Sequence, residues 1–461
     1  MNIPFSVRIE TLGCRLNQVE SEALAVRFSE AGFTVYPSGK SCPIRLCIVN
    51  TCTVTGKAEQ KARRLIRLLL KAHTEAVILV TGCYAELEAE TIEKINCRII
   101  AFSGKKKDEL YEFAGFIKSA FADKAEENIN VEAVKNIILQ FRNKIYSEKN
   151  TQLNADTMFK LSAPVFLFHS RASLKVQDGC NNACSYCRIR LARGKAVSLP
   201  AEEAVRRIRQ IEQNGACEVV LSGVNLSQYW DKQTGTFADL LLLLLQNTEH
   251  IRIRISSLYP ECIDNAILPV LKDKRICPHF HLSIQSGSDT ILKAMNRQYC
   301  RADIVQAVQS LREVKDNPFI GCDIITGFPS ESEEDFEQSF SLCSELKIPG
   351  IHVFPFSARQ GTKAFVMKAK IPERESGIRA QRLSALSKKN YVEYLSLCNG
   401  KVFFAVVEKP VKNRSLEVVT ENYLSLPLKT ENSADTYAGG EGVFVKINGT
   451  SAQLEILPPL W

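Results

Sequence analysis

The sequence contains no long apolar run. In its 461 residues the longest pure runs have six residues, as in the leucines Leu240–Leu245. A membrane-spanning helix needs about 20 apolar residues, so this run predicts the buried face of an ordinary helix. The N-terminal stretch MNIPFSVRIETLG also lacks the charged-then-apolar order of a secretory signal. We therefore expect a cytoplasmic protein with no membrane partner.

Histidine is scarce, with six residues, whereas cysteine is abundant, with sixteen. Cytosolic thiols are kept reduced, which argues against a disulfide framework. A structural zinc site normally uses two C-x2-C pairs or adds histidines, and no segment offers that pattern. Free cysteine otherwise behaves as a small apolar residue. Nine cysteines have no motif around them and are expected to be of this kind: Cys42, Cys97, Cys217, Cys262, Cys277, Cys300, Cys322, Cys343 and Cys398.

Composition sets broad limits on the class of protein. Hydrophobic residues make up 45% and charged residues 24%, which is ordinary for a globular protein. The length predicts about three domains. A net charge of +8 permits a polyanionic partner such as RNA without requiring one.

The stretch CNNACSYC, residues 180–187, places three cysteines at C-x3-C-x2-C spacing with no fourth nearby. A short predicted strand, 174–176, ends at Asp178 and Gly179, so the cysteines lie on a loop. A 4Fe–4S cluster is normally held by four thiolates. Three thiolates would leave one iron open, and a site with an open position is typical of catalysis.

This loop resembles the signature of the radical S-adenosylmethionine (SAM) enzymes. The resemblance implies that Cys180, Cys184 and Cys187 bind a 4Fe–4S cluster whose open iron is chelated by SAM. Reduction then cleaves SAM to a 5′-deoxyadenosyl radical, and the protein positions this radical against the substrate.

Downstream, predicted strands alternate with helices, as in a partial (β/α) barrel. The strands are expected at 218–225, 251–258, 279–288, 319–329 and 350–362. Ligands of such barrels bind at the carboxyl ends of the strands. The candidate SAM-pocket residues are therefore Gly223, Asn225, Ser283, Gln285, Asp323 and Phe354.

The first hundred residues repeat one pattern three times: an apolar strand, small residues, a cysteine and a helix. The cysteines are Cys14, Cys52 and Cys83. This is the βαβ pattern of a doubly wound parallel sheet, which places all three at one edge. We interpret them as ligands of a second three-thiolate cluster. Cys47 lies inside a strand and is expected in the core.

These segments resemble the methylthiotransferase family of radical SAM enzymes over nearly the whole chain. The matching stretches are GCRLNQVESE, NTCTVT and TGCYAE. The resemblance implies an auxiliary 4Fe–4S cluster that carries or donates sulfur. It also implies that one SAM methylates that sulfur and a second supplies the radical that removes hydrogen from carbon 2 of an adenine. No protein side chain is assigned as a catalytic acid or base.

The C-terminal segment changes to short alternating runs separated by Gly, Asn and Pro, which predicts a small antiparallel β-barrel. It resembles the TRAM domain that closes this family, and such barrels commonly bind nucleic acid. The expected α/β organisation is a methylthiotransferase domain, a linker, a radical SAM core and the TRAM-like barrel, at 1–125, 126–165, 166–395 and 396–461 respectively.

The resemblance implies a tRNA methylthiotransferase acting at the anticodon loop, with a flavodoxin-like or ferredoxin-like electron donor. Within the family, GCRLNQVESE and HVFPFSARQGT most resemble the branch that acts on N6-threonylcarbamoyladenosine. The alternatives are an isopentenyl-adenosine enzyme, an enzyme acting on a ribosomal-protein aspartate, an iron–sulfur electron carrier or sensor, and an RNA-binding protein without iron. A threonylcarbamoyl group carries a carboxylate, and Arg188, Arg190 and Arg193 are the candidate cations for it.

Overall fold

In the computed structural model the described residues are 6–36, 44–122, 129–147, 158–409, 416–429 and 437–455. Cys42, expected to be a buried apolar residue, lies outside them. They form two compact units. The first comprises residues 1–168, 177–182 and 187–199, and the second comprises 169–176, 183–186 and 200–461. None of the described helices is long and apolar enough to cross a membrane.

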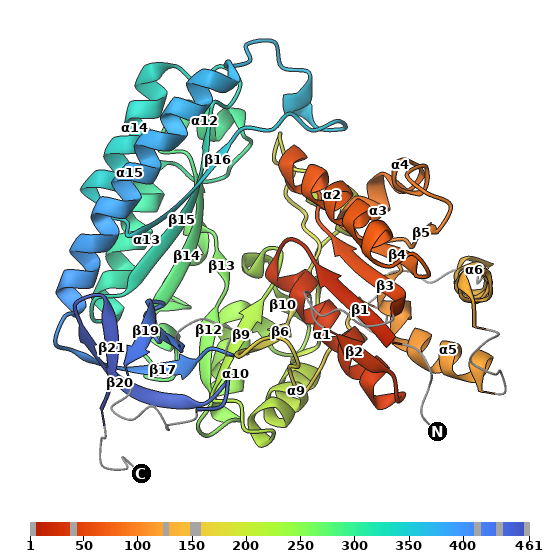
Figure 1. Cartoon of the computed structure of the whole chain (residues 1–461). Helices are drawn as coiled ribbons and strands as arrows, with labels where there is room; N and C mark the ends of the chain where they lie inside the picture. Colours follow the sequence, from red (N-terminus) through yellow and green to blue (C-terminus); the bar gives the residue numbers. More distant parts are fainter. Residues whose placement is uncertain are drawn as a thin grey trace. The chain divides into compact units, whose positions relative to one another are not determined.

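The first unit is a doubly wound parallel sheet with strand order β2-β1-β3-β4-β5, as the sequence predicted (Figure 1). This is the flavodoxin-like order, whose ligands bind where the order reverses, between β1 and β3. The strands are β1 Ser6–Thr11, β2 Thr34–Tyr36, β3 Ile44–Thr51, β4 Val77–Gly82 and β5 Ile99–Ala101. The helices are α1 Arg15–Glu30, α2 Gly56–Ala72, α3 Cys83–Leu87, α4 Ala89–Glu93, η1 Lys107–Glu112, α5 Phe113–Phe121 and α6 Val131–Ser147.

Alternation along the strands gives this sheet two separate apolar faces. Leu46 and Ile48 of β3 pack in a cluster with residues of α1, α5 and α6. Cys47 and Val49 pack in the opposite cluster, against α2. Cys47 is fully buried, which confirms its expected place in the core, and burial raises the pKa of its thiol to about 12.

The first unit also includes the segments that flank the cysteine loop. These are the antiparallel pair β7 Gln177–Asp178 and β8 Val197–Ser198, and the short helix α8 Ile189–Arg193.

The second unit begins as a row of parallel strands in two linked sheets, β6-β9-β12 and β13-β14-β15-β16. The two sheets are connected by a β-bridge between Ile253 and Ile276. They are also connected by the chain itself, since β13 directly follows β12. This is the predicted partial (β/α) barrel. The strands are β6 Ala172–Lys175, β9 Glu218–Ser222, β12 Arg252–Ile255, β13 Ser257–Leu258, β14 His279–Gln285, β15 Phe319–Thr326 and β16 Gly350–Pro355.

Helices cover one face of these strands. Figure 1 shows α13, α14 and α15 beside β14, β15 and β16. The helices are α9 Ala201–Gln213, α10 Phe237–Gln246, α11 Leu268–Leu271, α12 Asp289–Ala294, α13 Arg301–Val314, α14 Glu333–Glu345 and α15 Glu373–Cys398. The short connecting elements are η3 Leu226–Gln228, β10 Trp230–Asp231, β11 Gly235–Thr236, η4 Pro260–Cys262 and η5 Lys363–Phe365.

The C-terminal residues close into a five-stranded barrel of order β17-β18-β19-β21-β20. The pairs are antiparallel, as predicted, except for β19 with β21, which run parallel. The strands are β17 Val402–Val407, β18 Glu417–Thr420, β19 Ser425–Lys429, β20 Gly442–Asn448 and β21 Ser451–Leu454.

A buried ion pair joins this barrel to the parallel strands of the same unit. Arg254 on β12 donates to both carboxylate oxygens of Glu218, at 2.7 Å each. It also donates to the backbone carbonyls of Thr420 and Glu421 at the end of β18. The barrel core shares Phe319 of β15 and Tyr394 of α15 as well. Removing the barrel would therefore uncover a buried charge and apolar surface in the rest of the unit.

Candidate active site

The three cysteines of the first unit follow β1, β3 and β4, at the carboxyl edge of the sheet where the strand order reverses. Cys52 and Cys83 are buried and Cys14 is exposed, and all three are free thiols. Burial, followed by the charges of Cys14 and Cys83, raises the pKa of Cys52 to about 12. The three sulfurs are thus close enough to act on one another electrostatically. The sequence pattern had predicted this convergence.

Glycines allow the loops to approach so closely. Gly13 has φ of +107°, and a Cβ there would lie 2.4 Å from Cβ and 2.9 Å from Sγ of Cys52. Gly82 has φ of +92°, and a Cβ there would lie 2.4 Å from the carbonyl oxygen of Thr51. Only glycine tolerates both the left-handed backbone and the missing space. Steric limits therefore explain why a glycine directly precedes Cys14 and Cys83.

Arg193 supplies a buried positive charge beside these thiols. Its Nε donates to Sγ of Cys83 at 3.3 Å, and its Nη2 donates to Oδ1 of Asn17 at 2.6 Å. Its Nη1 donates to both oxygens of Asp178, at 2.9 Å each, and to Glu20 at 3.2 Å. Burial alone would lower the pKa of this guanidinium, but the facing acidic groups raise it well above its usual value. Arg193 is therefore permanently charged.

Asn17 and Glu20 complete this network from α1. Asn17 donates to the backbone carbonyls of Leu12 and Thr51, and so joins the loops after β1 and β3. Glu20 is fully buried and forms a second ion pair with Lys107 at 2.7 Å. Both residues lie in the stretch GCRLNQVESE, but the sequence alone had given them no individual role.

The C-x3-C-x2-C loop is anchored separately at its two ends and in its middle. In the first unit, the amide of Cys180 donates to the carbonyl of Gly194, and the amide of Ile189 donates to Sγ of Cys187 at 3.4 Å. In the second unit, Ser185, next to Cys184, accepts from and donates to the backbone around Met295 and Ala364. Amide donation to a cysteine sulfur is one way in which proteins tune iron–sulfur clusters. Three cysteines outside any disulfide and this amide contact fit an iron–sulfur cluster.

The candidate SAM-pocket residues all lie in the second unit, and five of them are at or near the ends of β9, β14 and β16. Asn225 is buried and caps η3, and Gly223 directly follows β9. Ser283 and Gln285 lie on the same face of β14, and Phe354 on β16 is exposed. Gln285 has φ of +71°, a strained region for a residue with a side chain, which is typical of ligand sites. Asp323 lies further back, in the middle of β15.

Comparison with known proteins decides the family. The radical SAM superfamily matches residues 174–343, and the uncharacterized protein family UPF0004 matches residues 6–104. The threonylcarbamoyladenosine tRNA methylthiotransferase MtaB of Treponema pallidum is 47% identical, covering 98% of this chain and 100% of that protein. The MtaB of Aquifex aeolicus is 34% identical, covering 91% and 96%. This chain belongs to the MtaB family of radical SAM methylthiotransferases.

More distant relatives include the tRNA-2-methylthio-N(6)-dimethylallyladenosine synthase of Syntrophus aciditrophicus, 30% identical over 88% of this chain and 84% of that protein. The solved structure of the radical SAM methyltransferase TsrM from Kitasatospora setae has a TM-score of 0.48 and 12% identity, covering 75% and 72%. As a radical SAM methylthiotransferase, the enzyme uses SAM and two 4Fe–4S clusters.

Two of the three arginines considered for the substrate carboxylate are already paired in this methylthiotransferase. Arg188 bridges Glu59 at 3.3 Å and Glu88 at 3.0 Å. Arg193 is held by Asp178 and Glu20. Arg190, by contrast, is exposed. The sequence alone could not show which of the three arginines pair with a carboxylate, because the carboxylates that neutralise Arg188 and Arg193 come mostly from distant segments.

The structure adds one arginine that the sequence had not suggested. Arg297 is partly buried among Tyr186, Tyr259 and Tyr299, with its guanidinium carbon 4.8–5.9 Å from the ring centroids. Its Nη2 donates to the hydroxyl of Tyr186 at 2.6 Å, whereas Nε and Nη1 have no hydrogen-bond partner among the described residues. Burial lowers the pKa of this guanidinium, but the facing tyrosines and Cys184 raise it well above its usual value. A partly buried cation with unused donors near Cys184 suits an anionic ligand.

Substituting Arg193 tests the buried network. Arg193→Met should destabilise the first unit by about 3–5 kcal/mol, because it leaves Asp178 buried without its cation. Hydrogen exchange at the amides of β3 and β4 measures the loss. Arg190→Met is the matched control and should stay within about 0.5 kcal/mol, since Arg190 is exposed. Equal protection in both variants would contradict a structural role for the network.

Proposed function

We propose that this methylthiotransferase converts N6-threonylcarbamoyladenosine beside the anticodon of tRNA into its 2-methylthio derivative. The observation that carries the proposal is the presence of two three-cysteine sites in one chain, one on a radical SAM loop and one at the switch point of a flavodoxin-like sheet. The relatives named MtaB support the substrate. An anticodon loop is single-stranded, so its base can enter a pocket without melting a helix.

The residues would divide the work as follows. Cys180, Cys184 and Cys187 hold the cluster that binds SAM, and Cys14, Cys52 and Cys83 hold the auxiliary cluster. The SAM pocket comprises Gly223, Asn225, Ser283, Gln285 and Phe354, and Arg297 offers its unused donors to the SAM carboxylate. Asp323 is kept apart from this pocket, because its carboxylate, in the middle of β15, pairs with His281. The sulfur comes from the domain at 1–125, and the radical is generated in the domain at 166–395. The barrel at 396–461 contacts the RNA. The enzyme acts in the cytoplasm with a flavodoxin-like or ferredoxin-like electron donor.

Iron analysis tests this ligand assignment. In anaerobically reconstituted protein, replacing Cys14, Cys52 and Cys83 by Ala should remove about half of the iron and spare SAM cleavage to 5′-deoxyadenosine. Replacing Cys180, Cys184 and Cys187 should remove the other half and abolish that cleavage. Cys47→Ala is the control and should keep both clusters, because its thiol is in the apolar core. Loss of iron in Cys47→Ala with full iron in Cys52→Ala would overturn the assignment.

The C-terminal barrel would bind the RNA backbone. Lys401, Lys429 and Lys446 are exposed on it, and Phe444 is a partly exposed aromatic ring. Point substitutions are the appropriate test, because deleting the barrel would uncover Arg254. Lys401→Glu with Lys446→Glu should weaken tRNA binding and reduce its salt dependence, since each phosphate contact contributes to that slope. Lys232→Glu, outside the barrel, serves as the control. An unchanged salt slope would favour a purely structural barrel.

Nucleoside analysis tests the substrate. Given tRNAs that carry either N6-threonylcarbamoyladenosine or isopentenyl-adenosine, the enzyme should methylthiolate the first. Arg190→Met should lower the rate about 10–100-fold, the value of a lost charged hydrogen bond to the substrate carboxylate. Arg206→Met, an exposed arginine on α9, is the control. Product from the isopentenyl substrate alone would refute the assignment, and product from neither would favour the ribosomal-protein alternative.

A further inference from the structure

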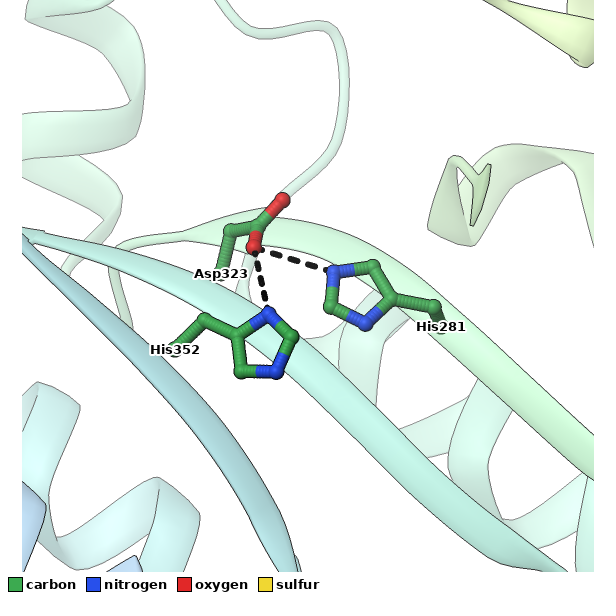
Figure 2. A group of neighbouring side chains, drawn as sticks. All are labelled: His281, Asp323 and His352. Carbon is green, nitrogen blue, oxygen red and sulfur yellow. Dashed lines mark ion pairs between the residues drawn. The ribbon is translucent and has the colours of Figure 1, made fainter. Parts of the chain in front are cut away.

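Three neighbouring strands of the second unit bring two imidazoles and a carboxylate together. His281 lies on β14, Asp323 on β15 and His352 on β16, and their ligand atoms all lie within 4.8 Å of one another. Figure 2 shows both rings turned toward the same carboxylate. We propose that this cluster is a binding site for a divalent transition-metal ion.

The strand register explains why these side chains meet. Asp323 pairs with His352 across β15 and β16, and His281 pairs with Gly321, two residues before Asp323. Side chains two apart along a strand lie on the same face. The neighbouring Cys322 points the other way, where it contacts Cys343 of α14. The cluster therefore lies on the face of the strands opposite α14.

Gly321 makes room for the first imidazole. A Cβ at this position would lie 2.8 Å from Nδ1 of His281, closer than a side chain can approach. Because Gly321 has no side chain, the ring of His281 can lie over the backbone of β15 with Nε2 directed at Asp323.

The distances between these atoms can accommodate a shared cation. Nε2 of His281 lies 3.0 Å from Oδ1 of Asp323, and Nδ1 of His352 lies 3.6 Å from the same oxygen. The second separation is too long for a hydrogen bond. Zinc bonds of about 2.0–2.2 Å to nitrogen and oxygen place adjacent tetrahedral ligands about 3.3–3.5 Å apart. The longer separation lies near that edge length, and the shorter one, which is also a hydrogen-bond distance, would lengthen slightly to admit an ion.

The donor set indicates the class of ion and an open position. Imidazole favours zinc, iron, copper and nickel, whereas sites for magnesium or calcium are built from oxygen ligands. The side chain of His281 is 12% exposed, that of Asp323 25% and that of His352 60%, so the cluster is accessible from the His352 side. Three protein ligands with an accessible fourth position are typical of a zinc site that also binds water or a further oxygen ligand.

Zinc loading with X-ray absorption tests the proposal on the full chain. The protein is first reconstituted anaerobically, so that the cysteines of both clusters are occupied by iron. It is then equilibrated with one equivalent of zinc chloride and desalted. We expect retained zinc with nitrogen and oxygen neighbours at about 2.0–2.2 Å and no sulfur shell at about 2.3 Å.

His352→Gln should weaken zinc binding at least tenfold, because changes even beyond the direct ligands cost about 10–100-fold. Asp323→Asn should act in the same way, whereas the control His250→Gln, an exposed histidine before β12, should bind as the wild type does. His352 is mostly exposed, so its substitution should preserve the fold, and an unchanged iron content verifies this. Failure of the wild type to retain zinc, a sulfur shell, or equal binding by His352→Gln would each overturn the proposal. None of these readouts depends on the tRNA substrate.

Discussion

The buried guanidinium of Arg193 is the interaction on which the arrangement of the first unit depends. It contacts Sγ of Cys83 after β4 and Asn17 after β1, and it pairs with Asp178 immediately before the SAM-type loop. A buried cation is tolerated only when its donors are satisfied by charge and hydrogen bonds. The loops after β1 and β4 and the segments flanking the radical SAM cysteines are therefore held in one geometry by a single side chain.

The parallel sheet explains why such a small network suffices. Because the strands are parallel, the loops that follow them all lie at the same edge of the sheet. Glycine is then needed only where two of these loops approach too closely for a side chain. Gly13 does so against Cys52, and Gly82 does so against the end of β3. The chemistry-bearing residues thus come from short loops on a rigid support, which suits a site that must hold its ligands in fixed positions.

Local patterns predicted the strands, the cysteine loop and the convergence of Cys14, Cys52 and Cys83, because each signal lies within a dozen residues. They did not predict what depends on distant partners. Arg193 and Glu20 are 173 residues apart in the sequence, and Arg188 and Glu59 are 129 apart. The ligand cluster of His281, Asp323 and His352 required the register of three strands. The role of Arg297 could not be predicted, because no spacing in the sequence shows which tyrosines surround it.

In the proposed reaction, the radical generated at one cysteine site acts on carbon 2 of a tRNA adenosine. The most direct measurement uses tRNA whose N6-threonylcarbamoyladenosine carries deuterium at carbon 2, with mass analysis of the 5′-deoxyadenosine formed. We expect deuterium to appear in 5′-deoxyadenosine in proportion to the methylthiolated product. Formation of the methylthio product with unlabelled 5′-deoxyadenosine would contradict the proposed reaction.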